Sequence, residues 1–298
     1  MKGCARTCLL WLLGWGAAAF AFHHYFIRIR DFGPPMYWAA AVAGLAVVLT
    51  FGYAWGIVAA YRERKMLVEA VAGTTLPDGK WIAISGPIHS MAPLTAPLSG
   101  RDSVAYEYKI SRSERVGRSS SDVPYFEGKA LTPSTIATRQ GTVRLLAVPS
   151  FQDVEPENVP PSQALANARE YVMLTEFRMR SEDKNAVDEE SMDDDGQYRR
   201  DRRHSASDVA LTEEFRYEEK RIGQGEQVCA FGLYSRQRGG FVPHPNWAHQ
   251  MRLMRGDAAA VAAKLRTRMI RYFAGVLLCS GAAYGIVRLY EWRAVVSP

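Results

Sequence analysis

The chain has 298 residues, of which 48% are hydrophobic and 11% aromatic, and its formal net charge at pH 7 is +6. This composition excludes a disordered or collagen-like chain, and the length allows one or two domains. The mean hydropathy of −0.17 excludes a protein made almost entirely of membrane-spanning helices. The four cysteines are too few and too scattered for a disulfide framework or a zinc site: Cys4, Cys8, Cys229 and Cys279.

Three apolar stretches predict transmembrane helices. Residues 9–27 and 36–61 contain no Asp, Glu, Lys or Arg, and residues 272–287 are apolar between Arg271 and Arg288. A helix rises about 1.5 Å per residue and must cross a hydrocarbon core of about 30 Å, so the first two stretches nearly match or exceed the required length. The third is shorter, but its flanking arginines can reach the interfaces and complete the span.

The first stretch also has an alternative interpretation as a cleaved signal peptide. Lys2 and Arg6 precede the apolar run, and Ala19-Phe20-Ala21 imitates a cleavage site. The apolar run continues beyond that site as far as Ile27, which favours an uncleaved anchor.

Basic residues beside the three stretches predict the orientation of the chain. Nine lie on one side of the membrane and four on the other; the nine are Lys2, Arg6, Arg62, Arg64, Lys65, Lys264, Arg266, Arg268 and Arg271, and the four are Arg28, Arg30, Arg288 and Arg293. Because positive flanks are retained in the cytoplasm, we expect a multi-pass protein with a cytoplasmic middle region and its C-terminus on the opposite side.

The charge distribution argues against a nucleic-acid partner. Residues 80–256 contain 24 basic and 25 acidic side chains, a net charge of −1, whereas the rest of the chain contains 13 basic and 6 acidic ones. The basicity therefore lies at the membrane flanks, where it favours contact with lipid headgroups. It does not form the basic patch that a phosphate backbone requires.

The middle region is predicted to be a compact antiparallel sheet or barrel. Alternating or continuous apolar patterns between Gly and Pro residues indicate strands at residues 81–86, 103–110, 142–148, 171–180, 211–222, 227–234 and 251–253. No alternation of strands with helices and no glycine-rich phosphate loop is present, which excludes a Rossmann or P-loop fold.

Two hydrophilic stretches are expected to be loops. Residues 113–122 are rich in Ser and Arg and predict an exposed hairpin loop. Residues 181–207 join an acidic block to a basic block with almost no apolar residues, which predicts a disordered loop. A cation site at Asp193, Asp194 and Asp195 is the alternative, but the glycine and glutamate spacing of a calcium loop is missing.

Helices are expected to connect the middle region to the membrane. Asp257 can cap a helix that begins with alanines at residues 258–260 and continues into the third apolar stretch. Residues 62–72 extend the second stretch as an amphipathic helix. Two GxxxG patterns, at residues 52–56 and 281–285, allow close helix packing and a homo-oligomer.

No residues are assigned to a catalytic, cofactor-binding or metal site, and no cofactor is expected. His23 and His24 lie at the end of the first stretch, where an interfacial role is favoured over a metal or haem role. His244 and His249 lack an acidic or Cys partner at ligand spacing. Cys229 is predicted to be an inert core thiol, because it lies in an apolar strand.

Several short motifs resemble the GIDE-type domain of the organelle-envelope RING E3 ubiquitin ligase family. The opening of that domain is similar to Gly86-Pro87-Ile88, Ala96-Pro97-Leu98-Ser99-Gly100 and Tyr106-Glu107-Tyr108, and its closing part to Gly232-Leu233-Tyr234, Gly239-Gly240-Phe241 and Leu253-Met254-Arg255-Gly256-Asp257. The resemblance covers residues 79–285 and implies a β-rich domain beside a membrane and an E3 ubiquitin-protein transferase-like activity. That activity needs a zinc RING after the last span, and residues 289–298 contain neither Cys nor His.

We therefore expect a membrane-anchored α+β protein with three transmembrane helices around a mainly antiparallel β-rich soluble domain. Its expected segments are residues 1–35, 36–78, 79–256 and 257–298. The favoured function is a noncatalytic binding or scaffold protein in the lipid bilayer with a protein partner; a ubiquitin-transferase-like protein without the RING is the alternative.

Overall fold

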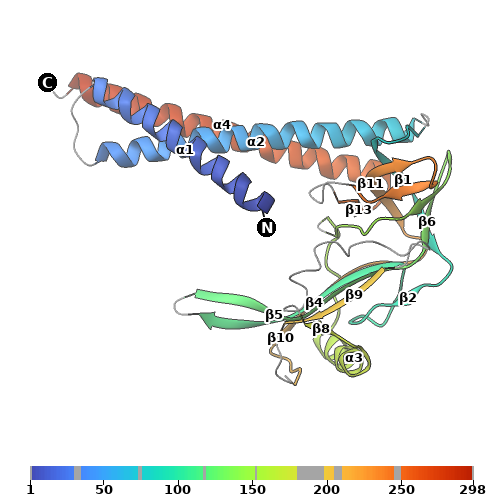
Figure 1. The fold of residues 1–298 in the computed structure, drawn as a ribbon. Helices are drawn as coiled ribbons and strands as arrows, with labels where there is room; N and C mark the ends of the chain where they lie inside the picture. The colour runs from blue at the N-terminus through green and yellow to red at the C-terminus, as the bar shows by residue number, and fades with distance from the viewer. Residues whose placement is uncertain are drawn as a thin grey trace. The chain divides into compact units, whose positions relative to one another are not determined.

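A computed structural model describes residues 2–29, 35–72, 76–116, 119–151, 153–179, 198–204, 210–244 and 250–296. The chain divides into two compact units, one formed by Met1–Lys65 with Ala263–Pro298 and the other by Met66–Ala262. The first is helical, and the second contains the β-strands (Figure 1).

The helical unit is built from α1 (Lys2–Ile29), α2 (Pro35–Val71) and α4 (Ala258–Val296), of which the last two continue into the second unit. Within the described residues, two helical segments are long and apolar enough to cross a membrane: Tyr37–Ala70 and Ala258–Trp292. The prediction of three transmembrane helices is thus not supported, since only two described helical segments meet the length and composition of a span. The first predicted stretch begins at residue 9, and the side chains of residues 1–10 lie outside the described part of α1.

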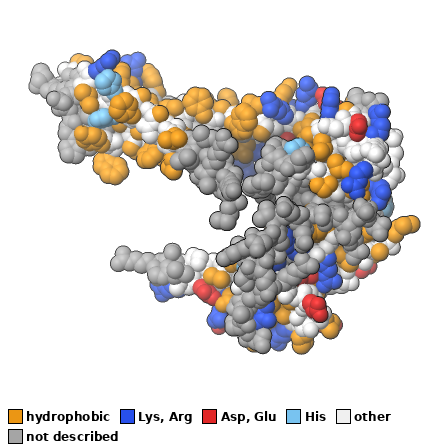
Figure 2. All heavy atoms as spheres, in the orientation of Figure 1, with side chains coloured by type: hydrophobic (Ala, Val, Ile, Leu, Met, Phe, Trp, Pro, Cys, Tyr) orange, Lys and Arg blue, Asp and Glu red, His pale blue; other side chains and the backbone are white. Residues whose placement is uncertain are grey.

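Small residues allow close packing in the helical unit, whose visible surface is largely hydrophobic (Figure 2). A Cβ atom added at Gly44 would lie 2.6 Å from the backbone nitrogen of Ala19, so α1 and α2 approach closely there. One added at Gly56 would lie 2.7 Å from the Tyr272 ring of α4. A Cβ atom added at Gly281 or Gly285 would meet nothing within 4 Å among the described residues, so neither glycine of the α4 GxxxG pattern makes a close helix contact there.

Five strands of the second unit close into a small barrel. They are β1 (Trp81–Ser90), β6 (Ser134–Thr138), β7 (Gly141–Leu145), β12 (Gly240–Val242) and β11 (Gln227–Ser235), and β11 pairs again with β1 to complete the ring. A further strand, β13 (Arg252–Arg255), pairs with β11. Among the described barrel pairings, only β7–β12 is parallel, which confirms a mainly antiparallel structure.

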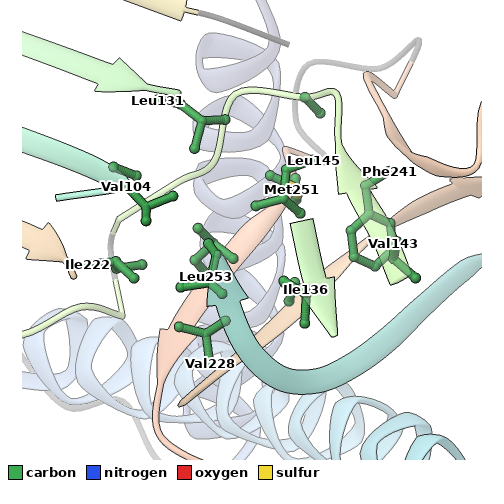
Figure 3. Close-up of a cluster of buried hydrophobic side chains, with 14 of the residues drawn as sticks. Val104, Leu131, Ile136, Val143, Leu145, Ile222, Val228, Phe241, Met251 and Leu253 are labelled. Carbon is green, nitrogen blue, oxygen red and sulfur yellow. The ribbon is translucent and has the colours of Figure 1, made fainter. Parts of the chain in front are cut away.

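Branched side chains from many elements fill the barrel (Figure 3). Ile136, Val143 and Val228 come from barrel strands and Leu253 from β13, and each is at most 1% exposed. Val104 directly precedes one strand of a second sheet and Ile222 is the last residue of another, and both are fully buried. Because the barrel core includes residues from both sheets, the two sheets pack within one unit.

The second sheet carries a helix on one face. Its order is β10 (Phe215–Ile222), β4 (Ala105–Val116), β5 (Ser119–Leu131), β9 (Tyr198–Arg203) and β8 (Arg178–Met179). Helix α3 (Pro161–Leu174) begins with proline, which suits the first turn of a helix. Its Ala164 and Ala168, four residues apart, pack with Tyr106, Tyr108 and Phe126 of the sheet. Two short strands, β2 (Leu94–Thr95) and β3 (Asp102–Ser103), pair nearby in the chain.

Three sequence-based predictions are wrong. Residues 171–174 belong to α3 rather than to a strand, because the apolar positions of 164, 168 and 171 follow helical spacing. The predicted loop at residues 113–122 is largely strand, since β4 and β5 pair up to Val116 and Ser119. Within the predicted loop at residues 181–207, residues 198–203 form β9 between β5 and β8; residues 181–197 and 205–207 lie outside the described residues.

The predicted start of the last helix is confirmed. The Asp257 carboxylate accepts a hydrogen bond from the backbone N–H of Ala260 at 2.7 Å, which is the geometry of an N-cap. Helix α4 then runs without interruption from Ala258 into its apolar segment.

Candidate functional site: a cleft beside helix α3

An open cleft of about 430 Å³ lies between α3 and the segment that joins β2 to β4. Its lining combines apolar groups with a few polar ones, which is the usual composition of a binding site. The lining residues are Leu94, Thr95, Ala96, Pro97, Gly100, Tyr106, Asn167, Glu170, Tyr171, Leu174, Thr175 and Arg199.

One wall of the cleft is a tight loop, residues 96–100, held by a buried carboxylate. Glu219 of β10 is 1% exposed and accepts backbone N–H groups of Leu98 at 2.7 Å and Ser99 at 3.2 Å. On the other side, the Asn167 amide of α3 donates to the Leu98 carbonyl at 2.9 Å. These bonds fix the loop to both the sheet and the helix, so the wall of the cleft is preorganised.

Beneath the cleft lies a buried acidic residue that accepts several hydrogen bonds. Asp201 of β9 is 7% exposed, and its Oδ1 accepts hydrogen bonds from the hydroxyls of Tyr108 at 2.8 Å and Tyr171 at 2.9 Å. Its Oδ2 accepts one from Nε of Arg199 at 2.9 Å. The Tyr106 hydroxyl lies 3.2 Å from that of Tyr171, which connects the cluster to the open cleft.

Electrostatics keep the phenols of this cluster protonated. Burial, followed by the charge of nearby Asp201, raises the pKa of both Tyr108 and Tyr171. Burial is also the main cause that raises the pKa of Tyr106. Neutral phenols are hydrogen-bond donors and poor bases at neutral pH, so they are suited to holding a polar ligand group.

Exposed apolar side chains lie at the C-terminal end of α3, beside the cleft. Met173 and Leu174 are each 79% exposed, and Leu174 also lines the cleft. The Arg199 side chain, 46% exposed, lies across the Tyr171 ring with its guanidinium carbon 5.6 Å from the ring centre. Aromatic, Arg and Met side chains of this kind are enriched at protein–protein interfaces.

Cys229 is buried, as its apolar surroundings predict. It is fully buried in β11, and burial raises the pKa of its thiol to about 11. Its Sγ lies 3.6 Å from the Gly256 carbonyl oxygen. A thiol with so little thiolate at neutral pH reacts slowly.

The histidines that the structure describes are not brought together. The His23 ring stacks on Tyr37 with centroids 4.7 Å apart, and the His244 ring lies 6.0 Å from that of Trp81. His249 and the three aspartates at 193–195 lie outside the described residues. Among the residues that the structure describes, no group of three or more His, Cys, Asp or Glu side chains could hold a metal ion.

Comparisons with family models, with curated proteins and with solved structures find no match. The resemblance to the GIDE-type domain therefore stays a prediction carried by its motifs. One of those motifs, Ala96-Pro97-Leu98-Ser99-Gly100, is the loop that forms the wall of the cleft.

The sequence did not identify the cleft, because its parts are far apart in the chain. Asp201 and Arg199 lie in a stretch predicted to be a loop, and Tyr171 in one predicted to be a strand. A usable signal was present in Tyr106 and Tyr108: their alternation with Glu107 and Lys109 places both phenols on the same face of a strand.

Proposed function

We propose that this chain is an integral membrane protein whose β-rich unit binds a protein partner at the cleft beside α3. The observation that carries the proposal is the combination of the exposed Met173 and Leu174 with the preorganised polar groups of the cleft. Exposed apolar side chains at the rim of a cleft that also carries polar groups suit a protein segment, which can bury side chains and pair its backbone groups.

Membrane insertion of three helices and a cytoplasmic β-rich unit are part of this proposal. The two apolar helical segments in α2 and α4 support it, as does the excess of basic residues on one side of the apolar stretches. In addition, α1 contacts both other helices: the Trp15 ring N–H donates to the Ala41 carbonyl at 2.9 Å, and the Tyr25 hydroxyl to Glu291 at 2.8 Å. We assign α1 as the additional span.

Photo-crosslinking in intact membranes tests the binding function. A benzoylphenylalanine placed at Met173 should form one discrete cross-linked product, whereas the same group at Met91, which is fully exposed, should not. The product should disappear when Leu174→Asp is added, because a carboxylate at the cleft rim opposes burial of an apolar side chain. Equal products from both positions, or a product that survives Leu174→Asp, would refute the cleft as the binding site.

A ubiquitin-discharge assay separates this proposal from the transferase-like alternative. The full chain in detergent is mixed with a ubiquitin-charged conjugating enzyme, and loss of the thioester is followed. A rate equal to that of empty micelles supports the binding function, while a faster rate that Leu174→Asp abolishes supports the alternative.

A further inference from the structure

The α3 cleft is bordered by the edge of a short strand. Both residues of β2, Leu94 and Thr95, line the cleft, whereas neither residue of β3 does. The edge of β2 that faces away from β3 therefore borders the cleft. An unpaired strand edge is a template to which an extended chain can add.

The hydrogen bonds around β2 show which backbone groups face this edge. The Ala96 N–H donates to the Arg101 carbonyl at 2.9 Å, so Ala96 turns its N–H toward the β3 side. Backbone groups alternate in direction along a strand, and those of Thr95 therefore point away from β3, toward the cleft. Asp102, which is opposite Thr95, follows the same alternation, because its carbonyl accepts a hydrogen bond from Arg221 rather than from β2, at 3.3 Å.

Two prolines confine strand addition to a single residue. Pro93 and Pro97 lie two positions before and after Thr95, where an extended strand would next turn its backbone groups toward the same edge. Proline has no N–H group, so neither can exchange a pair of hydrogen bonds with an added strand. An added strand therefore has one register, with its central residue opposite Thr95.

Such a strand would place two side chains in the cleft. Leu94 and Ala96 pack into the hydrophobic cluster beside α3, while Thr95 is exposed. Directly opposed residues of an antiparallel pair share a face, so the two neighbours of the central residue point into the cleft. Those neighbours are about 6.8 Å apart. This spacing is close to the rise of about 6 Å between Glu170 and Leu174, which line the cleft four residues apart on α3.

Glu170 gives the cleft an unbalanced negative charge. The charged residues among the described lining are Glu170 and Arg199, and Arg199 is bonded to the Asp201 carboxylate at 2.9 Å. Glu170 is exposed and has no hydrogen bond or ion pair with any residue that the structure describes. The segment that joins β8 to β9, residues 180–197, contains eight acidic and two basic side chains, so including it leaves the excess negative. The complementary partner is therefore basic.

The bonds between α3 and the loop of residues 96–100 set the direction of the cleft. Gln163 donates to the Ser99 carbonyl at 3.1 Å, and Asn167, one turn later, donates to the Leu98 carbonyl at 2.9 Å. Successive turns of α3 thus meet successively earlier residues of this segment, so α3 runs antiparallel to it. A strand added antiparallel to β2 therefore runs in the same direction as α3.

We propose, on the basis of the binding function above, that the partner binds as an extended segment added to β2, with a basic and then an apolar residue. Its central residue exchanges two backbone hydrogen bonds with Thr95. The residue before it is basic and faces Glu170, and the residue after it is apolar and packs against Leu174. Backbone pairing supplies affinity, and the two side chains supply specificity.

Fluorescence polarisation with the full chain in phosphatidylcholine nanodiscs tests the order of the two side chains. The labelled probe is Gly-Ser-Thr-Lys-Thr-Leu-Thr-Ser-Gly, and the matched control is the same composition with Lys and Leu exchanged. We expect the exchanged peptide to bind at least tenfold more weakly, because its apolar side chain loses its burial. Glu170→Gln should weaken binding of the first peptide at least threefold, whereas Glu213→Gln, which removes an exposed carboxylate outside the cleft, should not.

Two changes to the backbone test the strand pairing. Thr95→Pro removes the N–H donor and should weaken binding at least fivefold, while Thr95→Ala, which keeps both backbone groups, should not. Leu94 is extended, a conformation that a following proline allows, so we expect Thr95→Pro to fold. A peptide with an N-methyl group on its central threonine removes the other bond without altering the protein and should also bind at least fivefold more weakly.

The outcomes separate this proposal from the binding function on which it rests. Equal binding of the two peptides, absence of binding, or full binding of the N-methyl peptide would overturn the added strand. A photo-product at Met173 that Leu174→Asp removes would, in each of those cases, still identify the cleft as the partner site. Failure of the cross-linking experiment as well would refute the binding function itself.

Discussion

Replacing Asp201 with asparagine tests whether the buried carboxylate holds the α3 cleft together. Hydrogen bonds to a charged group contribute about 1 kcal/mol more than neutral ones. Asp201 accepts one bond from the buried Tyr108 phenol and one from the half-buried Tyr171 phenol, and both would become neutral in the variant. The third bond, from Arg199, contributes little because that side chain is 46% exposed. The new amide would nevertheless turn an N–H group toward the guanidinium, so two donors would face each other. We therefore expect Asp201→Asn to lower the free energy of unfolding by about 2–3 kcal/mol.

The buried thiol of Cys229 supplies the assay. Full-length protein in detergent is pulsed with an alkylating reagent at increasing urea, and mass spectrometry of the Cys229 peptide gives the unfolded fraction of the β-rich unit. Asp122→Asn is the matched control, because Asp122 is 42% exposed and its ion pair with Arg216 spans 3.4 Å. It should change stability by less than about 0.5 kcal/mol. If Asp201→Asn costs no more than this control, the polar cluster does not stabilise the cleft.

The remaining predictions concern the core, the acid range and the membrane topology. Cys229 should resist alkylation until the unit unfolds, and Cys229→Ser should cost about 1–3 kcal/mol, measured by urea unfolding followed by circular dichroism; rapid native labelling would contradict this. Burial alone would raise the pKa of Glu157, but Arg221 and Arg101 hold that pKa below its ordinary value. The stability that the Glu157 carboxylate contributes is therefore present above about pH 5 and is lost as the pH falls through the lowered pKa. The urea midpoint should therefore fall on acidification, and less steeply in Glu157→Gln. A reporter after Pro298 and one inserted within residues 181–207 should lie on opposite sides of the membrane; finding both on the same side would remove one proposed span.

Local patterns in the sequence predict the parts of this fold that depend on a single element. The apolar segments of α2 and α4 and the cap at Asp257 are continuous in the chain, and all three are confirmed. The buried strand around Cys229 is likewise visible in its own residues. The closure of the barrel is different, because it requires β1 to pair with both β6 and β11, which are separated by about 90 residues along the chain.

The candidate site could not be predicted because its residues gain their roles only from distant partners. Glu219 belongs to a charged strand and is nevertheless 1% exposed, since the backbone of residues 98 and 99 satisfies its carboxylate. The apolar neighbours of Tyr171 predict a strand, although its contact with the sheet follows helical spacing from Ala164 and Ala168. Such long-range compensation leaves no local periodic signal.

The stretch of residues 188–203 tests directly whether local composition or pairing with distant strands decides the stability of a segment. Its composition alone predicts that a Gly/Ser linker could replace all of it without loss of stability. In the structure, residues 198–203 pair with β5 along six residues, and Asp201 within them accepts the bonds that hold Tyr108 and Tyr171. Replacing residues 188–203 should therefore cost at least about 3 kcal/mol, because the buried donors lose their acceptor and β5 loses a neighbour. Replacing residues 188–195 alone, in the Cys229 alkylation assay, should cost less than about 1 kcal/mol. Equal costs for the two replacements would mean that β9 contributes nothing to the stability of the sheet.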